Sequence, residues 1–324
     1  MIATVLAIAF LILVHELGHL GAAKLVGVKV PEFSLGFGKV LVRRKLGDTE
    51  YCLRCFLLGG YVKTEDGFQD RPSLTRIFVA LAGPASNLLF AFLAFVLVSF
   101  VGLPQFTATI GQVFPGRPAA KAGLLPGDKV ISVDGRPVVR WAEMTDLVTE
   151  GKGRAVRLVV QRGHGTLVVS VTPETIDGKG MLGIKASGET VSTSYGLMAS
   201  IEKGLQITGE QLKGSAELIM KLVGLSPVDV IGPVQIVKVG AEQAQIGLIS
   251  LLFFMAILST SFVIFNLIPI PVLDGGLIAI TLVELVTGRK INQKLQLLAT
   301  KLSMAVVIGL MTFVFLSDLL KLAK

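Results

Sequence analysis

The chain has 324 residues, of which 52% are hydrophobic and 17% are charged, and its formal net charge is +8. A mean hydropathy of +0.72 is too high for an ordinary soluble domain and is typical of a membrane protein. The basic residues are spread along the chain without an arginine-rich tract or an aromatic-lined basic face, which argues against nucleic acid as a partner. Membrane topology explains the charge better.

Four segments have the length and apolarity needed to cross a lipid bilayer: residues 1–24, 76–103, 247–268 and 302–320. The first has no basic residue before Lys24 and no small-residue cleavage pattern, so we expect a retained helix rather than a removed signal peptide. Basic residues gather between the first and second segments and between the third and fourth. By the positive-inside rule, both of these loops are cytoplasmic, and both termini and the long central region are extracytoplasmic.

The first apolar segment contains LILVHELGHL, which places two histidines and a glutamate where ionisable side chains are costly. On a helix, His15 and His19 share a face because they are four residues apart, and Glu16 lies beside that face. Two such imidazoles can bind one metal ion, and the glutamate can take a proton from water, as in the HExxH motif of zinc hydrolases. A polar patch satisfied by neighbouring helices is the alternative, although leucine would serve a purely structural role at lower cost. We therefore predict one Zn²⁺ per chain.

The depth of this motif can be stated from helix geometry. At 1.5 Å per residue, His15 lies about 20 Å along the helix, past the middle of a hydrocarbon core of roughly 30 Å. The predicted site is therefore inside the membrane, near its cytoplasmic face.

A hydrolytic zinc site needs a third protein ligand. The only other histidine, His164, lies in a predicted extracytoplasmic turn and is excluded on topology. The segment NLIPIPVLDGG follows the third apolar segment, and its two prolines must interrupt the helix at the cytoplasmic-side depth of His15. Its one carboxylate, Asp274, is the leading candidate, and Glu284, farther along a predicted helix, is the alternative.

The central region, residues 106–190, has the strand and turn patterns of a small α/β domain. The runs VRLVVQR and LVVSVTP around RGHGT predict a β-hairpin. The sequence AGLLPGDKVISVDGRPV, with the later MLGIKA, resembles a PDZ domain of the bacterial, circularly permuted type. In such domains the LGI-type segment borders a groove for an extended peptide, which implies this role for Leu182, Gly183 and Ile184. A folded spacer that only limits access to the membrane part is the alternative.

Three motifs together carry a second resemblance. HELGH in the first segment, AGPASN in the second and NLIPIPVLDGG after the third, with the PDZ-like insert between the second and third, resemble the site-2 protease family of intramembrane zinc metalloproteases. The match is closest to the bacterial branch that processes anti-sigma factors. The resemblance implies that His15, His19 and Asp274 bind zinc and that Glu16 is the general base. It also implies that Asn266 contacts the scissile peptide or its oxyanion.

The loop between the first two segments has two extended runs around KLGDTE, which predict a β-hairpin that re-enters the membrane region beside the site. The resemblance implies that this hairpin, with Gly59, Gly60 and Tyr61, holds an unwound substrate by strand addition. Asn87 in the second segment is a further candidate for substrate contact. Cys52 and Cys55 are three residues apart and point to opposite faces of a strand, so we interpret them as packing residues.

The predicted fold is a polytopic α-helical membrane protein with about four transmembrane helices, a membrane-associated cytoplasmic β-hairpin and one inserted extracytoplasmic α/β PDZ-like domain. An N-terminal membrane region is predicted for residues 1–105 and a PDZ-like domain for residues 106–190. An amphipathic extracytoplasmic or interfacial segment follows at 191–246, and it includes a helix at 196–224 that lies on the membrane surface. Residues 247–324 form a C-terminal membrane region.

The predicted activity is zinc-dependent hydrolysis of peptide bonds within transmembrane segments of single-pass proteins in a bacterial inner membrane. Anti-sigma factors or signal-peptide remnants are the expected substrates, and the expected partners are these proteins and the lipid bilayer. Two alternatives stay open: a catalytically silent PDZ scaffold with a structural metal, and a membrane-anchored zinc protease that acts on soluble chains.

Overall fold

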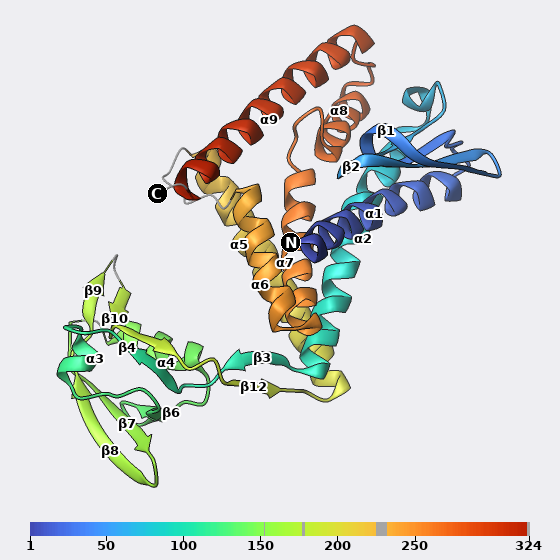
Figure 1. Cartoon of the computed structure of the whole chain (residues 1–324). Helices are drawn as coiled ribbons and strands as arrows, with labels where there is room; N and C mark the ends of the chain where they lie inside the picture. Colours follow the sequence, from blue (N-terminus) through green and yellow to red (C-terminus); the bar gives the residue numbers. More distant parts are fainter. Residues whose placement is uncertain (152, 177–178, 225–231, 323–324) are drawn as a thin grey trace. The chain divides into compact units, whose positions relative to one another are not determined.

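A computed structural model describes residues 1–151, 153–176, 179–224 and 232–322. The chain divides into two compact units (Figure 1). The membrane unit joins Met1–Val101 with Tyr195–Lys324, and the inserted unit is Gly102–Ser194.

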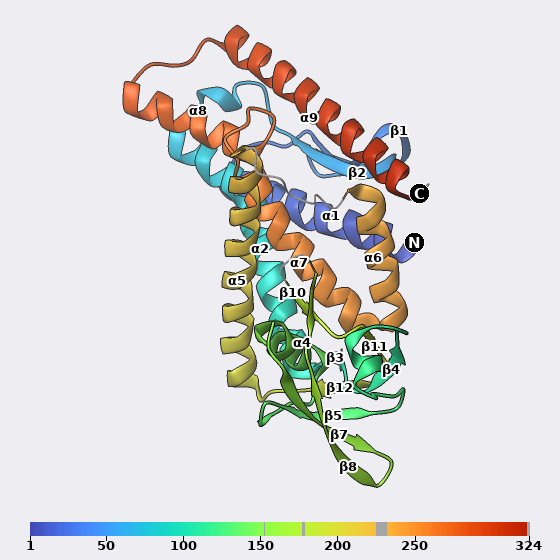
Figure 2. The same cartoon turned by 90° about the vertical axis from the view of Figure 1, so that its left-hand side faces the viewer.

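The membrane unit is built from helices, and α2 is its central helix. Within the described residues, four helices are long and apolar enough to cross a membrane: α1 (Ile2–Leu25), α2 (Ser73–Val101), α7 (Leu248–Asn266) and the 294–318 part of α9 (Gln293–Leu322). The remaining helices are the short 3₁₀ helix η1 (Phe68–Asp70), α5 (Leu197–Val223), α6 (Pro233–Ile246) and α8 (Asp274–Thr287). Helix α2 contacts α1, α5, α7 and α8 (Figures 1 and 2). The four predicted apolar segments thus coincide with helices, as expected of a polytopic membrane protein.

Small residues let α1 and α2 approach each other closely. A Cβ atom at Gly18 of α1 would lie 2.3 Å from the carbonyl oxygen of Ala82 on α2. Beside this contact, the Ser86 hydroxyl on α2 donates a hydrogen bond to the carbonyl oxygen of Val14 at 2.9 Å. Helices in lipid associate through such close packing and interhelical hydrogen bonds, so this contact fixes the helix with both histidines against α2.

The loop between α1 and α2 forms the predicted hairpin, from β1 (Glu32–Leu46) and β2 (Thr49–Lys63). The strands are antiparallel, and the turn between them contains Gly47 with a positive φ of 60°. Positive φ at a tight turn suits glycine.

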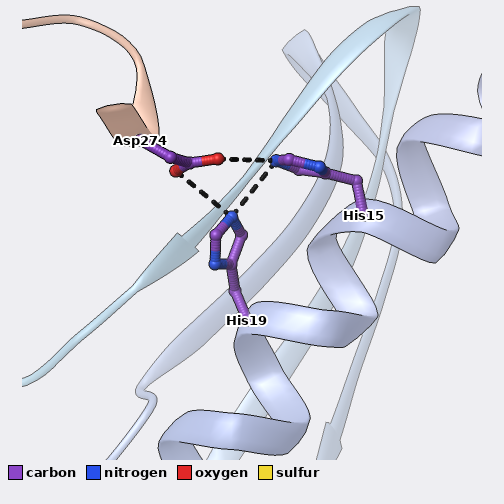
Figure 3. Close-up of side chains that lie close together, drawn as sticks. All are labelled: His15, His19 and Asp274. Atoms are coloured by element: carbon purple, nitrogen blue, oxygen red, sulfur yellow. Dashed lines mark hydrogen bonds and ion pairs between the residues drawn. The ribbon is translucent and has the colours of Figure 1, made fainter. Parts of the chain in front are cut away.

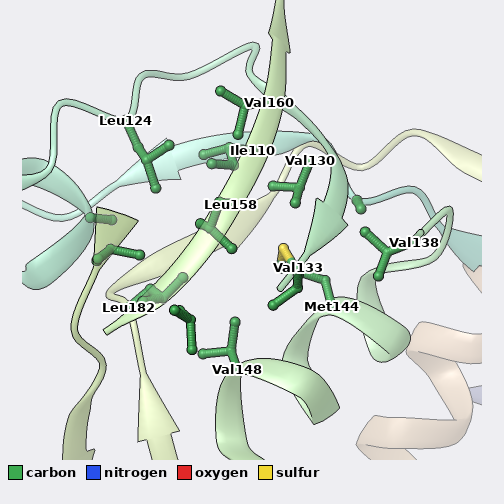
Figure 4. Packing of buried hydrophobic residues seen from close by; sticks show 14 residues of the cluster. Ile110, Leu124, Val130, Val133, Val138, Met144, Val148, Leu158, Val160 and Leu182 are labelled. Atoms are coloured by element: carbon green, nitrogen blue, oxygen red, sulfur yellow. The ribbon is translucent and has the colours of Figure 1, made fainter. Parts of the chain in front are cut away.

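The inserted unit has its own core. A four-stranded sheet in the order β6-β5-β7-β8 is joined by three two-stranded pairs, β4 with β11, β3 with β12, and β9 with β10. Its elements are β3 (Leu103–Phe106), β4 (Ile110–Val113), α3 (Pro118–Lys121), β5 (Lys129–Val133), β6 (Arg136–Pro137), α4 (Trp141–Glu150), β7 (Val156–Arg162), β8 (Gly165–Val171), β9 (Glu174–Ile176), β10 (Lys179–Met181), β11 (Ile184–Ala186) and β12 (Thr190–Thr193). Apolar side chains from the sheet, α4 and the loops form one buried cluster, which includes Ile110, Val130, Met144, Leu158 and Leu182 (Figure 4). The predicted hairpin around RGHGT is β7 and β8.

Residues 196–224 form the expected helix, α5, but its surroundings differ from the expectation. The sequence predicts a helix that lies on the outer membrane surface, whereas α5 packs lengthwise against α2 and α7. Glycine and small polar residues on one face of α5 make this contact.

Candidate metal centre

Three side chains from opposite ends of the chain meet beside α2. His15 and His19 extend from α1, and Asp274 is the first residue of α8 (Figure 3). The two histidine Nε2 atoms are 3.1 Å apart. The Asp274 carboxylate places Oδ2 3.1 Å from His15 Nε2 and Oδ1 3.3 Å from His19 Nε2. Ligand atoms from the three residues all lie within 4.8 Å of one another.

These distances and donors fit a zinc ion. Neighbouring ligands around a tetrahedral zinc with metal–ligand bonds of 2.0–2.1 Å are separated by about 3.3 Å. In addition, Asp274 Oδ2 is buried, and within the described part of the chain it has no hydrogen-bond partner apart from its ion-pair contact with His15 Nε2. Two imidazoles and one carboxylate leave one of four positions for water or substrate, which is the donor set of catalytic rather than structural zinc sites.

The backbone around Asp274 explains why two glycines follow it. A Cβ atom at Gly275 would lie 2.3 Å from the carbonyl oxygen of Leu267, and one at Gly276 would lie 2.2 Å from that of Ile270. The proline-interrupted stretch therefore folds directly beneath the first turn of α8. Only glycine fits there, and the tight fold turns the Asp274 side chain toward α1.

Glu16 lies beside the histidines under the hairpin. It is 8% exposed, and a Cβ atom at Gly60 of β2 would lie 2.8 Å from its Cγ atom. The other two hairpin residues predicted to bind substrate make different contacts. Gly59 lies against the ring of Phe37, and the Tyr61 hydroxyl donates a hydrogen bond of 2.7 Å to Glu32 Oε1. Of the three, Gly60 is therefore the one in contact with the site.

Helix α2 contributes contacts that residue types alone did not reveal. The carbonyl oxygen of Val79 lies 2.8 Å from His19 Nδ1. Gly83 faces both rings, because a Cβ atom there would lie 2.3 Å from His19 Nε2 and 2.8 Å from His15 Cε1. Asn87 is fully buried, with its Nδ2 atom 3.5 Å from His15 Nδ1. The AGPASN motif is the sequence signal for Gly83 and Asn87, whereas a backbone carbonyl leaves no such signal.

Two other predicted residues have polar partners outside this cluster. The Asn266 amide donates a hydrogen bond of 3.1 Å to the carbonyl oxygen of Phe262 in its own helix. Glu284, the alternative third ligand, forms a buried ion pair with Arg76 at 2.7 Å.

The predicted groove segment of the inserted unit is held in place by backbone hydrogen bonds to neighbouring segments and by core packing. Leu182 is 4% exposed and contributes its side chain to the core, and its carbonyl oxygen accepts a hydrogen bond from Ala119 N at 2.9 Å. Gly183 has a positive φ of 74°, and Ile184 begins β11, which pairs with β4. His164 lies in the turn between β7 and β8, where we expected it. In the membrane unit, Cys52 is buried and Cys55 is exposed, and both are free thiols.

Comparison with known proteins gives matches along the whole chain. The model of peptidase family M50 matches residues 3–310. A Nostoc protein named "Putative zinc metalloprotease" is 33% identical, over 98% of this chain and 95% of its own. The "Membrane metalloprotease ARASP, chloroplastic" of Arabidopsis thaliana is 31% identical, over 96% of this chain and 77% of its own. The "Regulator of sigma E protease" of Haemophilus influenzae is 26% identical, over 98% of both chains.

Among solved structures, the PDZ domain of the SdrC-like protein of Listeria monocytogenes is similar to part of the chain. That structure covers 26% of this chain and 90% of its own length, with 23% identity and a TM-score of 0.23.

Proposed function

The chain belongs to peptidase family M50 and is a zinc metalloprotease of the site-2 protease type, and from this premise we propose that it cleaves peptide bonds inside the membrane, within transmembrane segments of other proteins. The observation that carries the proposal is the convergence of His15, His19 and Asp274 on helices of the membrane unit. Two of the three ligands belong to α1, a helix long and apolar enough to span a bilayer.

In this proposal His15, His19 and Asp274 hold the zinc ion and Glu16 is the general base. When bound, Zn²⁺ would lower the pKa of a water molecule and would polarise the scissile carbonyl group. Glu16, buried beside the two histidines, accepts the proton of the attacking water and then delivers it to the leaving amine. Asn266 serves as an amide donor to the developing oxyanion once its side chain leaves the carbonyl oxygen of Phe262.

The hairpin is proposed to hold the substrate in an extended form. A helical peptide conceals its carbonyl groups in internal hydrogen bonds, so the target bond must be unwound before hydrolysis. The backbone of β2 at Gly60 lies against Glu16, so a strand added along this part of the hairpin brings its carbonyl groups beside the general base. Gly59 and Tyr61 then act by shaping the strand, and Leu182, Gly183 and Ile184 by receiving an extended peptide in the inserted unit.

Topology and substrates complete the proposal. The basic loops that follow α1 and α8 are cytoplasmic, and the termini and the inserted unit are extracytoplasmic, in a bacterial inner membrane. Single-pass proteins such as anti-sigma factors or signal-peptide remnants are the proposed substrates. The name of the Haemophilus influenzae relative supports a substrate linked to a sigma factor. In this arrangement the inserted unit admits chains already trimmed outside.

The test is cleavage of a single-pass substrate reconstituted with the protein in liposomes, with the product ends mapped by mass spectrometry. The wild type should cut within the apolar segment. Glu16→Gln should keep zinc and lose cleavage, and Asp274→Ala should lose both. Cleavage by Glu16→Gln at the wild-type rate would contradict the proposed role of Glu16 as general base. Cuts that fall only in soluble loops would favour a membrane-anchored protease for soluble chains, and zinc binding without any cleavage would favour a scaffold.

A further inference from the structure

The two histidines of the metal centre differ in what faces their second ring nitrogen. Both direct Nε2 toward Asp274. Nδ1 of His19 faces the carbonyl oxygen of Val79 at 2.8 Å, which is an acceptor. Nδ1 of His15 faces the Asn87 amide nitrogen at 3.5 Å, which is a donor. Asn87 Oδ1 is buried and has no hydrogen-bond partner within the described residues.

The chemistry of a metal-binding imidazole resolves this difference. An imidazole that binds zinc through Nε2 keeps its proton on Nδ1, and that N–H group needs an acceptor. Rotating the Asn87 amide by half a turn about its last side-chain bond exchanges Oδ1 and Nδ2, which differ little in shape. Oδ1 then accepts from His15 Nδ1, and the buried oxygen gains its partner.

We infer that Asn87 is a positioning residue whose Oδ1 accepts the Nδ1 proton of His15 and so keeps Nε2 available to zinc. Helix α2 thereby serves both histidines, through the Val79 carbonyl oxygen and the Asn87 amide oxygen. The backbone of Asn87 is itself held, because its carbonyl oxygen accepts a hydrogen bond of 2.9 Å from the Ser259 hydroxyl of α7. This role replaces the substrate contact that the sequence predicts for Asn87.

The inference rests on the proposed zinc site and is tested by metal affinity rather than by activity alone. Asn87→Leu removes the acceptor, and Asn87→Asp keeps an acceptor but has no donor when ionised. Zinc affinity is measured by chelator competition, and the absorption spectrum of the Co²⁺-substituted protein reports the ligand geometry. Asn87→Leu should bind zinc about 10–100-fold more weakly, and Asn87→Asp should bind at least as tightly as the wild type.

The two variants separate the outcomes even if Asn87→Leu fails to fold. Weakened zinc binding by Asn87→Asp would overturn the inference, because it would mean that Asn87 acts as a donor. Wild-type affinity and spectrum in a folded Asn87→Leu, with a raised KM, would return Asn87 to substrate contact and also overturn it. A wild type that binds zinc but cleaves no membrane segment would instead refute the proposed function and leave these affinities interpretable.

A second, independent inference concerns α5, which runs beside α2 and α7 toward the depth of the metal centre. Its N-terminal end is joined to α2 where Tyr195 N donates to the carbonyl oxygen of Ser99 at 3.1 Å. A Cβ atom at Gly204 would lie 2.5 Å from a Val96 methyl carbon. Farther along, the Ser215 and Ser261 hydroxyl oxygens are 3.4 Å apart.

These contacts give the depth of α5. At 1.5 Å per residue, Ser261 lies about 20 Å along α7 from its start at Leu248. One half-turn earlier on α7, Ser259 bonds to Asn87, which faces His15. The part of α5 near Ser215, in the second half of the helix, therefore lies about level with the metal centre, inside the span of α2 and α7.

Polar and charged side chains follow the face of α5 that is turned away from these helices. Their spacing of three or four residues makes one stripe along the helix, and all five side chains are exposed: Glu202, Gln206, Glu210, Lys213 and Glu217. Within the part of the chain that the structure describes, they form no ion pair, and their one mutual bond joins Gln206 to Glu210. An unpaired charge at this depth is stable only where it meets water. We propose that the polar stripe of α5 lines a water-filled groove that reaches the depth of the metal centre.

Cysteine labelling tests this proposal in the full chain in liposomes, in a background with Cys52→Ser and Cys55→Ser. Glu210→Cys and Lys213→Cys sample the stripe. Leu205→Cys is the matched control, because Leu205 is also exposed, at 67%, but lies off the stripe. His164→Cys in the turn of the inserted unit reports access of the reagent.

A charged, membrane-impermeant thiol reagent should label the two stripe cysteines and His164→Cys, and leave Leu205→Cys unlabelled. Labelling of His164→Cys alone would overturn the proposal, because the stripe would then face lipid. Equal labelling of Leu205→Cys would also overturn it, because α5 would then lie in water on all exposed sides, as a surface helix does. Zinc content measured on the same variants shows whether each is folded at the metal centre.

Discussion

Arg76 of α2 and Glu284 of α8 form an ion pair of 2.7 Å in which both side chains are at most 5% exposed. The Glu284 carboxylate also accepts hydrogen bonds from Ile291 N at 2.9 Å and from the Gln296 side chain at 3.2 Å. One carboxylate therefore ties α8, the turn after it and α9 to α2. Because Asp274 begins α8, this ion pair anchors the helix that brings Asp274 to the histidines.

Breaking this ion pair should destabilise the membrane unit. Arg76→Met leaves the Glu284 charge buried without its cation, which costs about 3–5 kcal/mol. The double variant Arg76→Met with Glu284→Met removes both charges and should recover most of that loss. Chemical unfolding in detergent micelles measures both.

The exposed pair between Asp70 and Lys290 is the control for this experiment. Asp70→Asn should not change stability measurably, because surface ion pairs contribute little. A double Met variant as unstable as Arg76→Met alone would show that the Arg76 or Glu284 side chain acts by some means other than its charge.

Gly83 should be intolerant of a side chain. The added methyl group of Gly83→Ala would overlap the ring of His19, 2.3 Å from Nε2 and 2.6 Å from Cε1, so the imidazole must turn away from Asp274. We expect loss of zinc and of cleavage with the helix content unchanged. Gly21→Ala on α1 is the matched control, because nothing lies within 4 Å of its added methyl group. That variant should keep zinc, since alanine also favours the helix. Full zinc occupancy in Gly83→Ala would contradict the geometry.

Zinc removal should destabilise the membrane unit selectively. A ligand that binds only the folded state stabilises it by about 2.7 kcal/mol when its free concentration is a hundredfold above Kd. Chelation should therefore lower the unfolding midpoint of the membrane helices, which is measured by circular dichroism. Asp274→Ala should unfold at the same midpoint with and without chelator. The single tryptophan, Trp141, belongs to the inserted unit, so its fluorescence transition should not move. A wild-type midpoint indifferent to chelator would argue against a zinc bound at this centre.

The inserted unit should lose stability in acid through Glu143. Burial raises the pKa of this carboxyl, but hydrogen bonds from the Arg140 guanidinium and from the Val139 and Arg140 N–H groups outweigh burial and lower it to about 2. Because the folded pKa lies below the usual 4.5, the stabilisation is complete above pH 4.5 and disappears as the pH falls toward 2. The side chain is 34% exposed, so we expect about 1 kcal/mol.

Trp141, the residue that begins α4, reports this transition by fluorescence during urea unfolding. The difference in stability between the wild type and Glu143→Gln should be present at pH 6 and vanish near pH 2. Other carboxyl groups titrate in both proteins and cancel in this difference. A difference that stays constant with pH would show that the Glu143 charge does not support the start of α4.

Local sequence patterns predict the parts of this structure that depend on spacing. His15 and His19 are four residues apart on a helix whose apolarity is evident, so their shared face follows from helix geometry. The sequence favours Asp274 over Glu284 as the third ligand, because the proline-interrupted stretch before Asp274 is expected at the membrane depth of His15. It could not show that Glu284 is engaged by Arg76, since the two residues are far apart in the chain and no local pattern links them.

Other features depend on what surrounds a residue, which its type does not reveal. The amphipathic pattern of α5 shows that it has two faces, but not that one of them covers α2 and α7. Tyr61 belongs to a recognisable segment, yet its hydroxyl is bonded to Glu32 across the hairpin. The contact of His19 with Val79 uses a backbone carbonyl, which every residue possesses. Tertiary packing decides such contacts.

The three side chains of the metal centre come from α1 and α8, which leave the ribosome at very different times, with the inserted unit made between them. During synthesis, α1 enters the membrane with its histidines long before Asp274 exists. The candidate metal centre is therefore assembled only when α7 and α8 have joined α2. If the proposed function is correct, a newly made molecule cannot cut the membrane proteins inserted beside it until its own chain is almost complete.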